Sequence, residues 1–273
     1  MMRYPGGKLR LMKKIDLLIA ARYPDAEDSS WVVGEPFTGG GGSLVNMAER
    51  FPHWKFHLND LNSDVYRFWK FFAYAPPNQM QRFYTKIRQT KPNVLVYNRI
   101  FSSKPKTDFD AAFRLLFLNK TSFGGYITQN LPIGGKGQAS KWGVGVYWNP
   151  ANIIQKCQRV KDAISGRIIS VTNQDCVEFV QALKGRLDFL YADPPYMSLG
   201  EQWYDCRFDI KSLTSFRAAI TNIPRWCISI DNSESTQGLF NQDIIQSVAV
   251  KHTSQSRNKT INIKNELVVF KGD

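Results

Sequence analysis

Short apolar runs alternate with amphipathic stretches along most of the chain. Runs rich in β-branched and aromatic residues predict strands, whereas apolar positions three or four residues apart predict helices. Strands and helices that take turns in this way are typical of an α/β fold. The predicted strands span residues 31–35, 55–59, 167–172, 187–192, 226–231, 245–251 and 267–270, and the predicted helices span 8–22, 44–50, 63–75, 177–183 and 213–221.

The alternation is interrupted between residues 76 and 150. Pro76 and Pro77 end the preceding helix, because proline cannot donate the hydrogen bond that continues a helix. The segment is rich in Lys, Arg, Gln, Asn and aromatic residues and lacks the strand signal of a parallel sheet. We therefore expect one α/β core, made of residues 1–75 and 151–273, with an inserted module at 76–150.

The composition adds a strong positive charge to this picture. The 273 residues include 36 Lys and Arg against 23 Asp and Glu, which gives a formal net charge of +13. Such an excess favours a polyanionic partner, because cationic side chains that contact phosphates release condensed counterions. Nucleic acid is the favoured partner, and a basic surface that only keeps the protein soluble is the alternative.

Cysteine and histidine are too sparse to suggest a metal site. The four cysteines lie far apart without a CxxC pair, and the chain has only three histidines. Cys176 and Cys227 occur in apolar, strand-like surroundings, where they are expected to act as small hydrophobic residues. The N-terminus lacks an apolar run long enough for a signal peptide or a membrane span, so a reduced cytoplasmic location is the default expectation.

The sharpest local signal is Asp193-Pro194-Pro195-Tyr196, directly after the apolar run 187–192. A carboxylate at a strand end reaches the edge of the sheet where open α/β folds bind ligands. The Asp193 carboxylate and the Pro194 carbonyl can both accept hydrogen bonds from an aromatic amine and localise its lone pair. Tyr196 can stack on the base that carries the amine. The alternative is a turn that ends the strand and performs no chemistry.

A glycine-rich turn joins the first predicted strand to the next helix. Gly39 and Gly41 allow a ligand to approach backbone N–H groups at the start of a helix. Dinucleotide enzymes use a similar turn, but Leu44 occupies the position of the third glycine in GxGxxG. The turn is therefore a weak signal by itself, and it speaks mildly against NAD.

Two acidic residues follow neighbouring predicted strands. Asp60 lies about 20 residues beyond the glycine turn, where a carboxylate is expected to hold ribose hydroxyls. Asp175 follows the strand 167–172 and could reach the adenine end of the same ligand. Each acid could instead be only a helix N-cap. Together with the glycine turn they indicate a nucleoside pocket beside a site that handles an amine.

The order of these motifs resembles that of Dam-type, D12-class DNA adenine methyltransferases over nearly the whole chain. The resemblance implies a Rossmann-like, seven-stranded S-adenosylmethionine-dependent sheet with an inserted, mostly helical target-recognition domain that contains a hairpin. It also implies methyl transfer to the N6 amino group of adenine in DNA. The segments that carry it are Arg3 to Lys8, Glu35 to Gly41, Asn59 to Asn62, Leu118 to Lys120, Asp193 to Tyr196, Ser229 to Ser233 and Asn265 to Lys271.

The resemblance also implies a role for individual residues. Asp193, Pro194, Pro195 and Tyr196 would hold the target base and form the catalytic site. Lys8 would contact the methionine end of the cofactor or close over it, although a solvated lysine is the simpler interpretation. The full set implied for the cofactor is Tyr4, Pro5, Gly6, Gly7, Lys8, Glu35, Pro36, Phe37, Gly39, Gly41, Asp60, Asp175, Cys176 and Asp193.

Duplex DNA buries the N6 group, so the target adenine must be flipped out of the stack. In the family a hairpin of the inserted module supplies an aromatic wedge, which corresponds to Phe123 here; a core position for Phe123 is the alternative. Arg257, Asn258 and Lys259 lie in a basic connection that could contact phosphates or simply be solvated. The implied DNA contacts are Lys120, Phe123, Tyr126, Thr128, Arg257, Asn258 and Lys259.

One position departs from the family members that read GATC. Those enzymes carry an arginine a few residues beyond the wedge, suited to bidentate contact with guanine. Thr128 stands in this region, within Tyr126-Ile127-Thr128-Gln129-Asn130. The sequence therefore predicts a target other than strict GATC, or a relaxed adenine context such as phage-encoded relatives can show.

Two other functions are compatible with parts of the pattern. The same cofactor could serve methylation of RNA adenine or of a protein glutamine amide, because related sites handle planar amines. A catalytically silent DNA-binding protein on the same scaffold is the third possibility, and the intact Asp-Pro-Pro-Tyr motif argues against it. We expect double-stranded DNA as the partner, S-adenosylmethionine as the cofactor, no metal, and a monomer, since one pocket per chain suffices.

Overall fold

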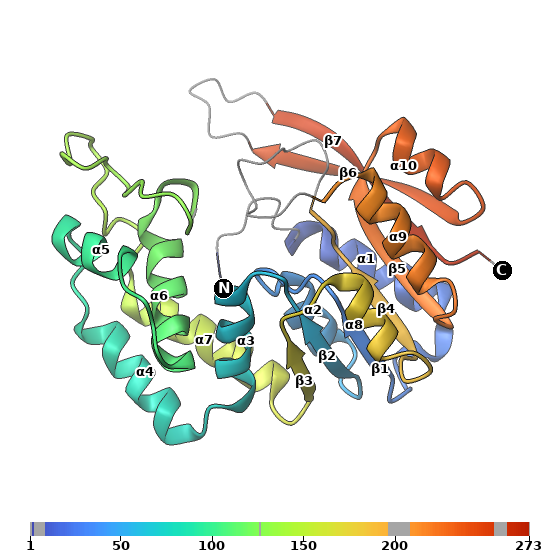
Figure 1. Ribbon diagram of the computed structural model, residues 1–273, viewed down its shortest axis with the longest axis horizontal. Helices are drawn as coiled ribbons and strands as arrows, with labels where there is room; N and C mark the ends of the chain where they lie inside the picture. The colour runs from blue at the N-terminus through green and yellow to red at the C-terminus, as the bar shows by residue number, and fades with distance from the viewer. Residues whose placement is uncertain (1, 3–8, 126, 196–207, 254–260, 273) are drawn as a thin grey trace.

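The computed structural model describes residues 2, 9–125, 127–195, 208–253 and 261–272. Within these ranges the chain forms a seven-stranded sheet in the order β3-β2-β1-β4-β5-β7-β6 (Figure 1). The predicted α/β class and the seven-stranded sheet are therefore confirmed. The strands are β1 (Val32–Glu35), β2 (Lys55–Asn59), β3 (Ile168–Thr172), β4 (Phe189–Ala192), β5 (Arg225–Asp231), β6 (Ile244–Thr253) and β7 (Ile261–Phe270).

The strand order reverses between β1 and β4. Strands β1 to β5 are parallel, whereas β7 runs antiparallel to β5 and pairs with β6 as a hairpin. The strands β2 and β3 lie on one side of β1 in the sheet. The strands β4 and β5 lie on its other side. Such a switch point leaves a crevice at the carboxyl ends of the two central strands, where open α/β sheets bind ligands.

Helices cover both faces of the sheet, as a parallel sheet requires. Along β4, Phe189 and Tyr191 join one hydrophobic cluster with α1 and α2, whereas Leu190 and Ala192 join a second cluster with α8 and α9. In Figure 1, α8 and α9 lie in front of the strands. The helices are α1 (Leu9–Arg22), α2 (Gly42–Arg50), α3 (Ser63–Tyr74), α4 (Pro77–Gln89), α5 (Val94–Phe101), α6 (Asp108–Thr121), α7 (Pro150–Ile164), α8 (Cys176–Ala182), α9 (Ile210–Ile220) and α10 (Glu234–Leu239).

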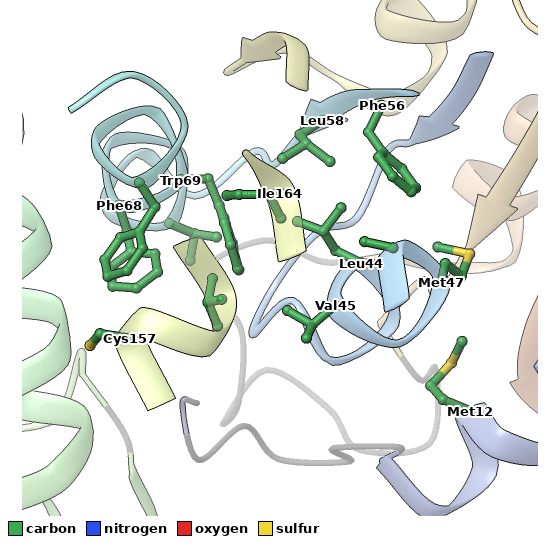
Figure 2. Close-up of a cluster of buried hydrophobic side chains, with 14 of the residues drawn as sticks. Met12, Leu44, Val45, Met47, Phe56, Leu58, Phe68, Trp69, Cys157 and Ile164 are labelled. Carbon is green, nitrogen blue, oxygen red and sulfur yellow. The ribbon is translucent and has the colours of Figure 1, made fainter. Parts of the chain in front are cut away.

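The first hydrophobic cluster fixes the positions of α2, which follows the glycine turn, and of α3. Figure 2 shows side chains from α2, β2, α3 and α7 that meet in it. Because α2 begins and α3 follows at the carboxyl edge of the sheet, this packing fixes the positions of both helices at that edge. The labelled residues of the cluster are Met12, Leu44, Val45, Met47, Phe56, Leu58, Phe68, Trp69, Cys157 and Ile164.

The inserted segment is mostly helical and packs against α3 and α7. Arg114 of α6 donates to Asp64 of α3 at 2.7 Å, and Arg67 of α3 donates to Asp108 of α6 at 3.0 Å. Hydrophobic side chains of α4, α5 and α6 belong to the same cluster as those of α3. The division of the chain at residues 76–150 stays a prediction, because this core is continuous.

Outside the inserted segment, for which only a mostly helical character was predicted, the two helices α7 and α10 were not predicted. The polar side chain of Lys161 on α7 donates to the carbonyl oxygens of Phe72 and Ala75 at 2.9 and 3.1 Å, which ties α7 to the end of α3. No helix in the described ranges is both long enough and apolar enough to cross a lipid bilayer.

Candidate active site

The glycine turn after β1 and the Asp-Pro-Pro segment after β4 begin side by side. In the parallel pairing of these strands, Val33 is opposite Phe189 and Gly34 is opposite Leu190. The chain therefore leaves both strands at the same level of the sheet, at the edge where the strand order reverses. The structure thus brings together two motifs that lie about 150 residues apart in the sequence.

The buried side-chain amide of Asn59 joins the turns after two strands to the end of a third strand at this edge. Asn59 Nδ2 donates to the carbonyl oxygens of Pro36 and Gln174 at 3.1 and 3.0 Å. Its Oδ1 accepts from the Thr172 hydroxyl at 2.8 Å and from the Gln174 backbone N–H at 3.0 Å. Asn59 therefore fixes the turns after β1 and β3 to the end of β2. The sequence places Asn59 in a family motif but does not indicate this role for it.

The Asp60 carboxylate accepts a hydrogen bond from the glycine turn. Its Oδ2 accepts from the Gly39 N–H at 2.8 Å, and its Oδ1 accepts from the Asn62 N–H at 2.9 Å. Burial raises the pKa of Asp60 to about 6, against the lowering effect of these two hydrogen bonds. The carboxylate thus lies beside the turn, as the predicted ribose contact requires, and the contact itself stays a prediction.

Both glycines of the turn that were assigned to the cofactor have left-handed backbones. The φ angle is 47° at Gly39 and 66° at Gly41. Trp69 of α3 donates from Nε1 to the Gly39 carbonyl at 2.9 Å, so the helix supports the turn directly. Phe37, also in this turn, packs edge-on against Phe208 and Phe216, with ring centroids 5.3 Å apart in each case.

Glu35 is an unusual residue for the end of a buried strand. Its side chain is 0% exposed, and its Oε1 accepts from the Ser43 hydroxyl of α2. The second oxygen, Oε2, has no hydrogen-bond partner within the part of the chain that the structure describes. Burial, together with the charges of Asp193 and Asp60, raises the pKa of Glu35 to about 8, and the Ser43 hydrogen bond opposes this rise.

Asp193 lies at the edge of this group of acids and is half-buried. The Ser229 hydroxyl of β5 donates to Asp193 Oδ1 at 3.4 Å. Pro194 is buried and Pro195 is half-buried. The peptide bonds to these two prolines carry no N–H, so the carbonyl oxygens dominate the local polarity. An acceptor-rich site of this kind is suited to a hydrogen-bond donor such as an amino group.

Asp175 and Cys176 occupy the N-terminus of α8. Asp175 is exposed and caps the helix, because its Oδ1 accepts from the Val177 N–H at 2.8 Å. The helix-cap alternative for Asp175 is therefore realised, and its contact with a cofactor stays a prediction. Cys176 is buried, as expected for a small hydrophobic residue, and its assignment to the cofactor also stays a prediction.

Where a hairpin was predicted in the inserted segment, the structure has a loop closed by one isolated antiparallel bridge. Ser122 and Pro132 form an antiparallel bridge, and the Phe123 N–H donates to the Leu131 carbonyl at 2.8 Å. Phe123 is 60% exposed, so the alternative that it belongs to the module core is wrong. Thr128 is exposed in the same loop. Both side chains are accessible to a partner, and their DNA contacts stay predictions.

Lys120, which was assigned to DNA, is buried in the structure. Its side chain is only 7% exposed, at the buried C-terminal end of α6. Burial raises the pKa of the Cys157 thiol on α7 to about 12, and the Lys120 charge opposes that rise. Lys120 therefore exposes little surface to a phosphate in this structure, and its contact with DNA stays a prediction.

Several predicted site residues lie outside the described residues, and their roles stay predictions. They belong to the N-terminal Pro-Gly-Gly-Lys segment, the Asp-Pro-Pro-Tyr motif, the loop after α6 and the basic connection after β6. These residues are Tyr4, Pro5, Gly6, Gly7, Lys8, Tyr126, Tyr196, Arg257, Asn258 and Lys259.

The known proteins that are similar to this chain include type II methyltransferases. A type II methyltransferase of Methanocaldococcus jannaschii, M.MjaIII, is 23% identical over 216 residues, which cover 73% of this chain and 70% of the relative. M1.LlaDCHI, a type II methyltransferase of Lactococcus lactis subsp. cremoris, is 23% identical over 207 residues, 73% of this chain and 66% of the relative. A SAM-dependent methyltransferase from Agrobacterium tumefaciens has a TM-score of 0.45 at 8% identity, covering 97% of this chain and 62% of that structure.

The decisive match extends over nearly the entire sequence. Residues 4–262 match the D12 class N6 adenine-specific DNA methyltransferases, a span that includes both central strand ends and the inserted segment. The cofactor of these enzymes is S-adenosylmethionine. The chain therefore belongs to the D12 class N6 adenine-specific DNA methyltransferase family, and it transfers a methyl group from S-adenosylmethionine to the N6 amino group of adenine in DNA.

Proposed function

We propose that Asp193 and the Pro194 carbonyl hold the N6 amino group of an adenine flipped out of duplex DNA, while the turn after β1 holds S-adenosylmethionine beside it. The observation that carries this proposal is the adjacency of the two motifs at the ends of β1 and β4. The Asp193 charge also contributes to the raised pKa of Glu35, which supports the proposal.

The residues at this edge fit the cofactor that the family uses. S-adenosylmethionine carries a sulfonium and an ammonium group, and a buried carboxylate is strongly stabilised by a nearby positive charge. Glu35 offers an unpartnered carboxylate oxygen in the part of the chain described, and Asp60 and Asp193 act electrostatically on it. Gly39 and Gly41 keep the turn free of side chains. We assign Glu35, Phe37, Gly39, Gly41 and Asp60 to hold the cofactor.

The reaction needs an adenine nitrogen that is a better nucleophile than it is in water. The N6 lone pair is delocalised into the purine ring. Hydrogen bonds from N6 to Asp193 and to the Pro194 carbonyl draw the nitrogen toward tetrahedral geometry and localise that lone pair. The same acceptors stabilise the positive charge that develops on N6. When bound, S-adenosylmethionine supplies the electrophilic methyl group on its sulfonium.

The loop with Phe123 and Thr128 is assigned to the DNA around the target. An exposed aromatic ring at this position can fill the gap that an extruded base leaves in the stack. Thr128 offers one hydroxyl where an arginine would make two hydrogen bonds to guanine. We therefore propose an adenine target other than strict GATC, or one with a relaxed context.

Two experiments test the proposal. Methyl transfer from labelled S-adenosylmethionine to duplex DNA, to RNA and to protein is compared for the wild type and Asp193→Ala, with the exposed Asp28→Ala as the matched control. We expect methylation of duplex DNA that Asp193→Ala abolishes while cofactor binding in calorimetry is retained; full activity of Asp193→Ala would refute the assignment. Mapping N6-methyladenine in a genome after expression tests the target, and a strict GATC pattern would contradict it.

A further inference from the structure

A line of buried polar groups stands behind the carboxylate that we assign to the target amine. Ser229 of β5 donates to Asp193 Oδ1 at 3.4 Å, and its hydroxyl also lies 3.1 Å from the hydroxyl of Tyr191 on β4. The Tyr191 hydroxyl in turn lies 3.3 Å from Met12 Sδ on α1. The line therefore runs from the first helix, across two neighbouring strands, to the site.

Both hydroxyl groups are fully buried. The face of the sheet that carries Tyr191 is covered mainly by apolar side chains of the first hydrophobic cluster, and it also carries the buried carboxyl group of Glu35. A hydroxyl on such a face lowers stability unless it is hydrogen-bonded, so phenylalanine and alanine would be the simpler choices for packing. The hydroxyl groups of Tyr191 and Ser229 are explained if they orient the Asp193 carboxylate through hydrogen bonds.

The two hydroxyl protons have a preferred order. A carboxylate is a much stronger acceptor than a thioether. The Ser229 proton is therefore directed to Asp193, and the Tyr191 proton is directed to Ser229, with Met12 as the weaker alternative. Burial raises the pKa of Tyr191 well above its ordinary value, and the Asp193 charge adds to this rise. Tyr191 thus keeps its proton and remains a donor.

We propose that Ser229 is a positioning residue for Asp193, and that Tyr191 holds the Ser229 hydroxyl in the donating orientation. This inference rests on the proposed role of Asp193. A hydrogen bond to Oδ1 fixes the rotation of the carboxylate and favours its ionised form. The other oxygen is then directed at the N6 amino group in a defined geometry, which is what a near-attack arrangement requires.

The test compares Ser229→Ala and Tyr191→Phe with the wild type in steady-state methylation of DNA over a range of pH. Loss of the Ser229 hydroxyl should lower kcat by about 10- to 100-fold, the range for a hydrogen bond to a charged group, with little change in KM. The acid limb of the kcat profile should move to higher pH, because Asp193 loses a donor that favours its ionised form. Tyr191→Phe should shift the limb in the same direction with a smaller loss of kcat.

Controls separate positioning from folding. Ser170→Ala removes a hydroxyl from β3, where it lies 2.7 Å from His57 Nδ1, and should leave the kcat profile unchanged. Ser229→Cys keeps a weak donor of similar size and should recover part of the lost kcat. A lower melting temperature with an unshifted pH profile, or a Cys variant no better than Ala, would overturn the inference. If Ser229→Ala matches the wild type while Asp193→Ala is inactive, the inference fails and the proposed function stands; an active Asp193→Ala removes both.

Discussion

The indole ring of Trp69 lies directly against Gly41. A Cβ atom on that glycine would lie 2.0 Å from Trp69 Cζ2 and 2.3 Å from Cη2. The same ring donates its Nε1 hydrogen to the carbonyl oxygen of Gly39. One side chain of α3 therefore clamps the turn after β1, and the protein's own packing requires glycine at position 41 whether or not a ligand is bound.

Replacement of Gly41 by alanine should damage both folding and cofactor binding. The new methyl group clashes with Trp69, and the φ of 66° is unfavourable for alanine. We expect a loss of about 2–4 kcal/mol in the free energy of unfolding, measured in urea, and weaker S-adenosylmethionine binding in calorimetry. Gly42→Ala is the matched control, because nothing lies within 4 Å of its added Cβ. Equal stability of the two variants would contradict the packing argument.

The contacts of Trp69 and Asn59 with the turn after β1 could not be predicted from the sequence. The predicted strands and the two motifs were found because each depends on a local pattern of apolar residues, glycine or proline. Trp69 and Asn59 were given no role, because their partners lie 30 and up to 115 residues away. In the sequence they are an aromatic residue on a helix and an amide at a strand end, which many structural positions share.

The burial of Lys120 was missed for a similar reason. The C-terminal half of α6 is buried on all sides, since every residue from Leu115 to Thr121 is buried. A lysine is ordinarily at the surface, so its residue type did not indicate this burial, and its contact with DNA was implied by the family resemblance. The missed helix α7 did carry a signal, since its buried residues Ile153, Cys157, Val160 and Ile164 recur at helical spacing.

Removal of the Asn59 side chain should loosen the edge of the sheet. Asn59→Ala leaves the Pro36 and Gln174 carbonyls and the Gln174 N–H without their partner. We expect a loss of about 2–4 kcal/mol in the free energy of unfolding, because buried polar groups left unpaired are costly. Asn152→Ala, on the exposed side of α7, should change stability by less than about 0.5 kcal/mol. If urea denaturation gives similar losses in the free energy of unfolding for Asn59→Ala and Asn152→Ala, Asn59 does not stabilise this edge of the sheet.

The buried acids should make the ligand-free protein less stable as the pH rises. The pKa of Glu35 is raised from 4.5 to about 8 by burial, so folding takes up a proton between these values. Its contribution to stability is fully present below pH 4.5 and is lost as the pH rises through 8. Asp16 and Asp60, with pKa values raised to about 7 and 6, act in the same direction. The limiting slope for one group is about 1.4 kcal/mol per pH unit.

Glu35→Gln isolates the contribution of that residue to this pH dependence. The amide is neutral throughout, so the stability of the variant relative to the wild type should increase from pH 5 to pH 8 in urea denaturation without cofactor. Glu178→Gln makes the same substitution at an exposed position on α8 and should show no such trend. Parallel curves for Glu35→Gln and the wild type would mean that Glu35 is ionised in the folded protein across this range.

Loss of the exposed ring at Phe123 should affect duplex DNA selectively. A side chain that fills the gap left by a flipped adenine is needed only when the target is paired and stacked. Because Phe123 is 60% exposed, Phe123→Ala should leave the melting temperature almost unchanged. Methylation of duplex DNA should fall by about tenfold or more, in line with about 1–3 kcal/mol for an aromatic ring stacked on a base.

Single-stranded DNA provides the contrast that makes this last prediction specific. An unpaired target adenine leaves no gap in a duplex, so Phe123→Ala should methylate it nearly as well as the wild type. Leu95→Ala is the control within the same inserted segment, since this side chain is 81% exposed on α5 and lies outside the loop that carries Phe123. An equal loss on both forms of DNA would assign Phe123 to general DNA binding, whereas no loss on either would remove it from the site.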